Sequence, residues 1–230
     1  MRVAVHFLPQ RARRGVMLGA LAAVVALAGC AGRQVSSTPQ RYDLGADTAA
    51  APTMAARAPV ALSFAAAPTI GDGGMVWRVG DSASPQTYAT VRWAAAPADL
   101  VRQRLIDRLS RQGPVVTETL VAGVPQLRVT LARFEQVFAP DGASSSGEIS
   151  LQALLVRDRT VIAQTRIDEA VAAPTQDAAG GVAALRVATT QAGDALAVWL
   201  ARQGAGVQGV GTPGASGAAA APAARGTRQP

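Results

Sequence analysis

The sequence predicts an α+β fold: an antiparallel sheet of about five to six strands with two helices packed on one face. Three observations indicate this fold. Short apolar segments with strand periodicity outnumber the helical segments, turn residues separate them, and the links between the later strands are too short for crossover helices. Residues 41–203 are expected to form this body, after a tether at residues 30–40.

The first half of the body contains several strands and one helix. A helix is expected to run from Pro97 to about Gln112, because proline suits a first helical turn and an apolar stripe follows at helical spacing. Gly113 and Pro114 then stop it. The helix also carries Arg102, Arg104, Arg108 and Arg111, a face typical of solvated arginines, with contact to lipid head groups or a partner as the alternative. Strands are predicted at residues 60–64, 75–79, 88–93 and 115–121.

The second half is predicted to hold a long strand, a hairpin and a final helix. In residues 126–138 the apolar residues change phase near Ala132 and Arg133, which indicates a bulge or a strand covered on both sides. The hairpin is expected to join residues 149–156 to residues 161–170, and the helix to span residues 177–203, with its first turn weakened by Gly180 and Gly181. Residues 204–230 are rich in Gly, Ala and Pro, and we expect this tail to be disordered.

The amino terminus carries a secretory signal. Four arginines and no acidic residue precede an apolar run that is too short to span a bilayer, so residues 1–29 are interpreted as a signal peptide. Leu27, Ala28 and Gly29 lead into Cys30, the only cysteine, and resemble the lipobox of bacterial lipoproteins. That resemblance implies cleavage before Cys30, attachment of acyl chains such as palmitate to its thiol, and a membrane-anchored mature protein.

Residue types exclude most catalytic chemistry from the mature chain. The single histidine, His6, lies in the leader, and the chain has no lysine, so a serine nucleophile has no usual base. We therefore predict no catalytic residues, no metal site, no cofactor and no enzymatic activity. Residues 41–203 contain 15 arginines and 15 acidic residues, and this neutral balance argues against nucleic acid as a partner.

A series of short motifs resembles the ABC-type transport auxiliary lipoprotein family. The order is a lipobox cysteine, a Tyr-x-Leu segment, a strand ending in an arginine, a Tyr-x-x-x-x-Trp-x-x-x-Pro run into a helix, a strand of the form Leu-x-Val-x-Leu-x-x-Phe-Glu, and a helix ending in Trp-Leu. After Cys30, the matching residues are Tyr42, Leu44, Met75, Val76, Trp77, Arg78, Tyr88, Trp93, Pro97, Leu127, Val129, Leu131, Phe134, Glu135, Trp199 and Leu200.

This resemblance implies a lipoprotein held by its acyl chains to the outer membrane, on the periplasmic face. It implies an auxiliary or docking role in the transport of lipids or other hydrophobic compounds, with the periplasmic substrate-binding component of an ABC transporter, bearing a mammalian-cell-entry domain, as partner. It also implies a possible homo-oligomeric ring. Lipoprotein regulators of periplasmic cell-wall enzymes share the anchor, the tether and a small domain, so that role is the alternative, and a lipid carrier with an internal cavity is a third.

Four residues are candidates for contact with such a partner: Trp77, Arg78, Tyr88 and Trp93. Aromatic side chains of this kind also fill cores beneath helices, which is the competing interpretation.

Overall fold

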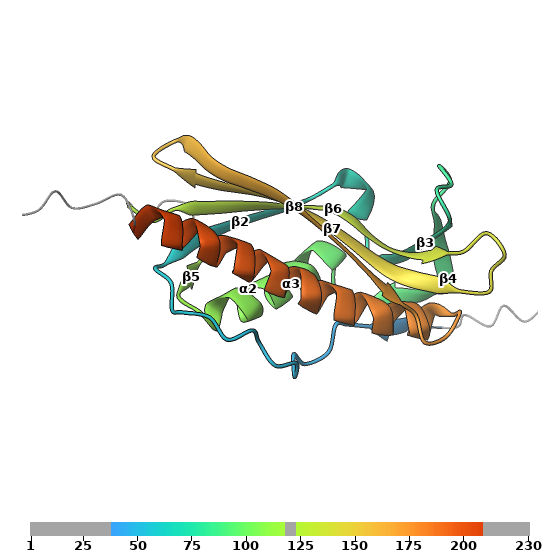
Figure 1. Ribbon diagram of the computed structural model, residues 1–230. Helices are drawn as coiled ribbons and strands as arrows, with labels where there is room; N and C mark the ends of the chain where they lie inside the picture. The colour runs from blue at the N-terminus through green and yellow to red at the C-terminus, as the bar shows by residue number, and fades with distance from the viewer. Residues whose placement is uncertain (1–37, 118–122, 209–230) are drawn as a thin grey trace, which may run out of the picture. The chain divides into compact units, whose positions relative to one another are not determined.

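The computed structural model describes residues 38–117 and 123–208, with side chains up to residue 204. In this part of the chain one layer is a twisted sheet, and the helices cover one of its faces (Figure 1). The predicted signal peptide, Cys30 and the predicted tail beyond residue 208 lie outside the described residues. The elements are β1 (Gln40–Tyr42), β2 (Val60–Ala66), the 3-10 turn η1 (Pro68–Ile70), β3 (Gly74–Val79), β4 (Gln86–Trp93), α2 (Pro97–Ser110), β5 (Val115–Val116), β6 (Gln126–Phe138), β7 (Ser145–Arg157), β8 (Thr160–Ala172) and α3 (Ala178–Gln208).

The sheet has eight strands and is mixed, which corrects the expectation of an antiparallel sheet of five to six strands. The order is β1-β4-β3-β6-β2-β5, and β7 pairs with both β6 and β8. As expected from the short links, β6, β7 and β8 are antiparallel neighbours. However, β2 and β3 both run parallel to β6, and β1 runs parallel to β4. Between β2 and β6 the chain forms α2, which supplies the crossover that a parallel pair requires.

The phase change in β6 is a bulge. Pairing with β7 shifts between Leu131 and Arg133, so Ala132 is the extra residue. Leu127, Val129 and Leu131 are buried before the bulge, and Phe134 is buried after it. The bulge therefore returns Phe134 to the helix-covered face, and it is one of the two alternatives that the phase change indicated.

Two short strands share one side of β6. β2 pairs with its first half, ending with Ala66 opposite Leu131, and β3 pairs with its second half, beginning with Trp77 opposite Gln136. Between these strands the chain leaves the sheet through η1, and the last ladder contact is the Ala67 amide donating to the Leu131 carbonyl at 2.9 Å. The strand beside β6 is thus interrupted at the level of the bulge.

Helix α2 begins at Pro97, as expected, and ends at Ser110. Its apolar stripe is fully buried, since Val101, Leu105 and Leu109 have no exposed surface. In the following segment only Val115 and Val116 are in strand β5, and residues 118–122 of the predicted strand lie outside the description.

Helix α3 packs beneath β7 and β8 and runs beside α2. It continues past the expected end at Gln203 to Gln208. The two glycines in its first turn occupy crowded positions. A Cβ atom on Gly180 would lie 2.0 Å from the Thr175 carbonyl oxygen, and one on Gly181 would lie 2.2 Å from Oε1 of Gln136, so a larger residue at either position would require its neighbours to move.

Candidate functional site

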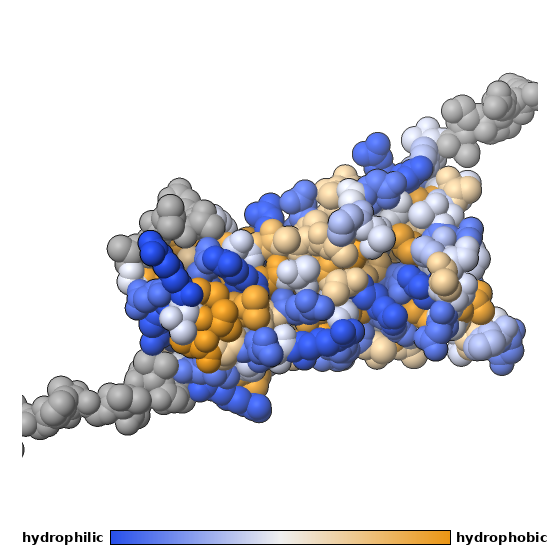
Figure 2. Space-filling model, turned by 90° about the horizontal axis from the view of Figure 1, so that it is seen from above, coloured by the Kyte–Doolittle hydropathy of each residue, from blue (hydrophilic) through white to orange (hydrophobic). Residues whose placement is uncertain are grey.

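Within residues 38–117 and 123–208, the sheet face that carries no helix is left uncovered. Figure 2 looks onto this face and shows hydrophilic and hydrophobic residues intermixed, with a hydrophobic patch toward one end. The β7–β8 hairpin contributes three large exposed apolar residues, Leu154, Val161 and Ile162.

A groove of about 640 Å³ lies on this face where η1 interrupts the strand beside β6. The turn at residues 68–72 forms one wall, and residues 85–87 at the start of β4 form the other. The floor is made by Val76 and Arg78 of β3 and by residues 132–135 of β6. The interruption between β2 and β3 therefore creates the groove, because a continuous strand would fill this space.

The floor of the groove holds a buried carboxylate between two arginines. Glu135 is 4% exposed, with Oε1 2.7 Å from Nε of Arg78 and 3.3 Å from Nε of Arg133. Arg133 reaches on to Glu148 at 2.6 Å. Arg78 also donates to the Ser82 carbonyl at 2.8 Å. The charges alternate in sign and compensate one another, so the groove suits a polar protein surface better than a highly charged small ion.

The four predicted contact residues do not form one surface. Arg78 lines the groove on the open face. Trp93 is 4% exposed and packs against Phe134 with ring centroids 5.2 Å apart, which places it in the core. Trp77 and Tyr88 are half-buried and lie together, with ring centroids 6.1 Å apart.

Tyr88 is tied to the buried amide of Gln136. Its hydroxyl donates to Oε1 of Gln136 at 2.9 Å, and Nε2 of Gln136 donates to Ser145 and to the Asp177 carbonyl, just before α3. Burial, with the negative charge of Asp177 as a second cause, raises the pKa of Tyr88 above its usual value. This tyrosine therefore joins β4, β6 and the start of α3 in its neutral form.

We expect Tyr88 to make stability fall at high pH. Because its pKa is raised in the folded state, its contribution is complete below the unfolded pKa of about 10 and is lost as the pH rises through the folded value. In a Tyr42→Phe variant, which leaves Tyr88 as the single tyrosine, the midpoint of the tyrosinate absorbance titration should lie at a higher pH in the folded chain than in the unfolded chain. A Tyr88→Phe variant should not show the loss of unfolding free energy at alkaline pH, as measured by urea unfolding. A normal titration midpoint would contradict this assignment.

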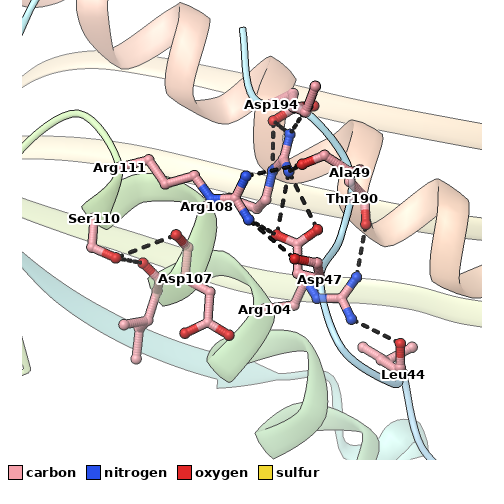
Figure 3. Close-up of polar contacts among 12 residues, drawn as sticks. Leu44, Asp47, Ala49, Arg104, Asp107, Arg108, Ser110, Arg111, Thr190 and Asp194 are labelled. Carbon is pink, nitrogen blue, oxygen red and sulfur yellow. Dashed lines mark hydrogen bonds and ion pairs between the residues drawn. The ribbon is translucent and has the colours of Figure 1, made fainter.

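A second polar cluster lies on the helix side and fastens the chain preceding β2. We call residues 43–57 the strap. Arg104 of α2 donates to the carbonyls of Leu44 and Gly45 and to Thr190 of α3, at 2.7 to 2.8 Å (Figure 3). Arg57, at the end of the strap, donates to the Leu109 carbonyl at 2.9 Å.

Arg108 is the centre of this cluster. Its guanidinium contacts the carboxylates of Asp47 and Asp194 and donates to the carbonyls of Ala49 and Ala50 (Figure 3). Arg108 is only 1% exposed, and each of its three guanidinium nitrogens has a hydrogen-bond partner that compensates for the loss of water. The expectation of a solvated arginine face is therefore wrong for Arg104 and Arg108, because the strap covers that face of α2.

The family follows from a match along most of the body. A family model described as the ABC-type transport auxiliary lipoprotein component matches residues 42–197. The chain belongs to this family.

Solved structures similar to this auxiliary lipoprotein share its fold. A crystal structure of a Xanthomonas campestris protein, assigned to the family model DUF330, is 20% identical with a TM-score of 0.59, covering 74% of this chain and 96% of the other. A crystal structure of an uncharacterized protein is 17% identical with a TM-score of 0.55, covering 71% and 99%. No curated protein matches the chain.

The residues predicted to direct lipidation of the auxiliary lipoprotein, Leu27, Ala28, Gly29 and Cys30, lie outside the described residues. Between residues 38 and 208, apart from 118–122, no helix is long and apolar enough to cross a membrane. The same described ranges contain no group of three His, Cys, Asp or Glu residues arranged to hold a metal ion. The sequence did not predict the burial of Glu135 or the contacts of the strap. The available signal for Glu135 was an acidic residue within an apolar strand, and the signal for the strap was the Tyr-x-Leu segment at its start.

Proposed function

We propose that the protein is an outer-membrane lipoprotein that docks the periplasmic substrate-binding component of an ABC transporter moving lipids or other hydrophobic compounds. The match to the auxiliary family over residues 42–197 carries the transport assignment. The lipobox and Cys30 support the anchor, and Ala31 after the cysteine supports delivery to the outer membrane, since an aspartate there retains lipoproteins in the inner membrane.

We infer that the groove on the open sheet face receives the partner. Its floor combines apolar atoms of Val76 and Phe134 with the paired charges of Arg78, Glu135 and Arg133. Interfaces of this mixed kind bind proteins, with an arginine as a frequent anchor. The strap and the helices lie on the opposite face of the sheet.

The resemblance to the auxiliary lipoprotein family also supports self-association of the protein, up to a ring of copies. Any such ring needs a contact surface between neighbouring copies. The alternative function, regulation of a periplasmic cell-wall enzyme, needs the same anchor and predicts a different partner.

Whole-cell crosslinking tests this proposal. A photoreactive residue at Thr87, in the groove wall, is expected to capture the substrate-binding component, whereas the same residue at Arg102, exposed on α2, should not. Arg78→Ala should reduce the yield from Thr87 by about tenfold, the effect of losing one interface arginine worth about 1.4 kcal/mol. Capture of a cell-wall synthase from Thr87 would favour the alternative. Equal capture from Thr87 and Arg102 would remove the groove from the proposal.

A further inference from the structure

Strand β8 presents a long edge with no strand beside it in the described part of the chain. It pairs with β7 along residues 160–172, and its other side pairs with no described strand. The Ala173 amide donates to the Ser145 carbonyl at 2.8 Å, which fixes the direction of the backbone groups. Residues 171, 169, 167 and 165 therefore point their amides and carbonyls toward β7, and residues 172, 170, 168, 166 and 164 point theirs outward. Such an edge is a template for another strand.

Two opposite charges lie in the middle of this edge. Arg166 and Asp168 are exposed, their side chains being 62% and 55% accessible, and Nε of Arg166 lies 2.7 Å from the Asp168 carboxylate. Both project onto the open face, since they are paired with Gln152 and Ser150 of β7. Both also belong to the set whose backbone groups point outward.

The charges select one register for antiparallel pairing of β8 with a second copy of itself. Outward-pointing residues must face outward-pointing residues, so allowed registers differ by steps of two. A two-fold axis at Ile167 places Arg166 opposite Asp168 of the second copy, and Asp168 opposite its Arg166. An axis at residue 166 would oppose the two arginines, and an axis at residue 168 would oppose the two aspartates, both of which are unfavourable.

We propose that two copies of the protein pair through β8 about a two-fold axis at Ile167, forming one continuous sheet with Arg166 facing Asp168 across the axis. Each copy uses the same surface, so the contact closes at two chains. Larger assemblies then need a second surface. The pair would also carry two anchors, and simultaneous insertion of both strengthens membrane attachment through effective concentration. This contact is independent of the docking groove, which lies across the sheet between β3 and β6.

Cysteine crosslinking tests the register. In the proposed pair residue 164 faces residue 170 of the other copy, at a separation that a disulfide spans. A chain carrying both Gln164→Cys and Ala170→Cys should form disulfide-linked dimers when intact cells are oxidised. The two single variants are matched controls and should form at most a tenth as much. Within one strand the two positions are about 20 Å apart, so the double variant cannot form the bond inside one chain.

Charge reversal tests the pairing energetically. In the full mature chain, purified in detergent, Arg166→Asp and Asp168→Arg should each raise the dimer dissociation constant about tenfold, because two like-charge contacts replace two favourable ones. The combined Arg166→Asp and Asp168→Arg variant should return to within about threefold of the starting value. Thermal unfolding of each variant separates loss of pairing from loss of folding.

Three results would overturn the proposal. One is a chain that stays monomeric at every concentration tested. Another is an oligomer whose dissociation is unchanged by either reversal. The third is a ring in which the double cysteine variant links no better than the single variants.

Discussion

Replacing Cys30 with serine is expected to release the protein from the outer membrane. The thioether cannot form on a hydroxyl, so neither acyl attachment nor the cleavage that follows it should occur. The comparison is made by separating inner and outer membranes and measuring the mass of the chain's amino-terminal peptide. The wild-type chain should begin at an acylated Cys30 and sediment with outer membranes, whereas the variant should retain residues 1–29.

A displaced thiol provides the matched control for this variant. Ser37→Cys added to Cys30→Ser restores one cysteine seven residues along the chain without restoring the lipobox spacing. Anchoring should remain lost. A Cys30→Ser chain that is correctly trimmed and still sediments with outer membranes would show that the anchor lies elsewhere.

Replacing Arg108 with methionine is expected to lower the free energy of unfolding by about 3 to 5 kcal/mol, the range for breaking a buried ion pair by removing one partner. The variant removes the buried guanidinium from Asp47 and Asp194 and leaves the Ala50 carbonyl without its donor, whereas Arg111 still contacts Asp47 and the Ala49 carbonyl. Arg108→Lys should recover only part of the loss, since an ammonium cannot reproduce the planar set of contacts. Urea unfolding measures each value.

The control for Arg108 lies on the same helix. The Arg102 side chain is 42% exposed and pairs with Asp99 one turn earlier, so Arg102→Met should change stability by less than about 1 kcal/mol. Similar losses for the two variants would contradict the role assigned to the strap.

The parts of the fold that were predictable from sequence are those determined by local pattern. A few neighbouring residues determine each of three features: the apolar stripe of α2, the bulge in β6 and the β7–β8 hairpin. The parallel pairs were not predictable in this way. Residue 60 of β2 and residue 115 of β5 meet only because a helix lies between them, and apolar alternation does not record the partner of a strand.

The site was less predictable than the fold, because exposure depends on what covers a surface. Arg104 and Arg108 have the spacing of solvated residues, and a segment about 60 residues earlier in the chain buries them. Among the four contact candidates, Trp93 is a core residue and Arg78 lines the groove, a distinction that depends on which sheet face the helices cover. The ion pair of Glu135 depends on Arg78, which lies far away in the sequence and is brought beside it by β3.

The interruption between β2 and β3 makes the groove a modular feature. Both short strands are held in register by the same long neighbour, β6, each through its own ladder. Residues added or deleted between Ala67 and Gly73 would change the size of the groove wall at residues 68–72 without shifting the register of either strand. The shape of this recess can thus change while the scaffold around β6 stays intact.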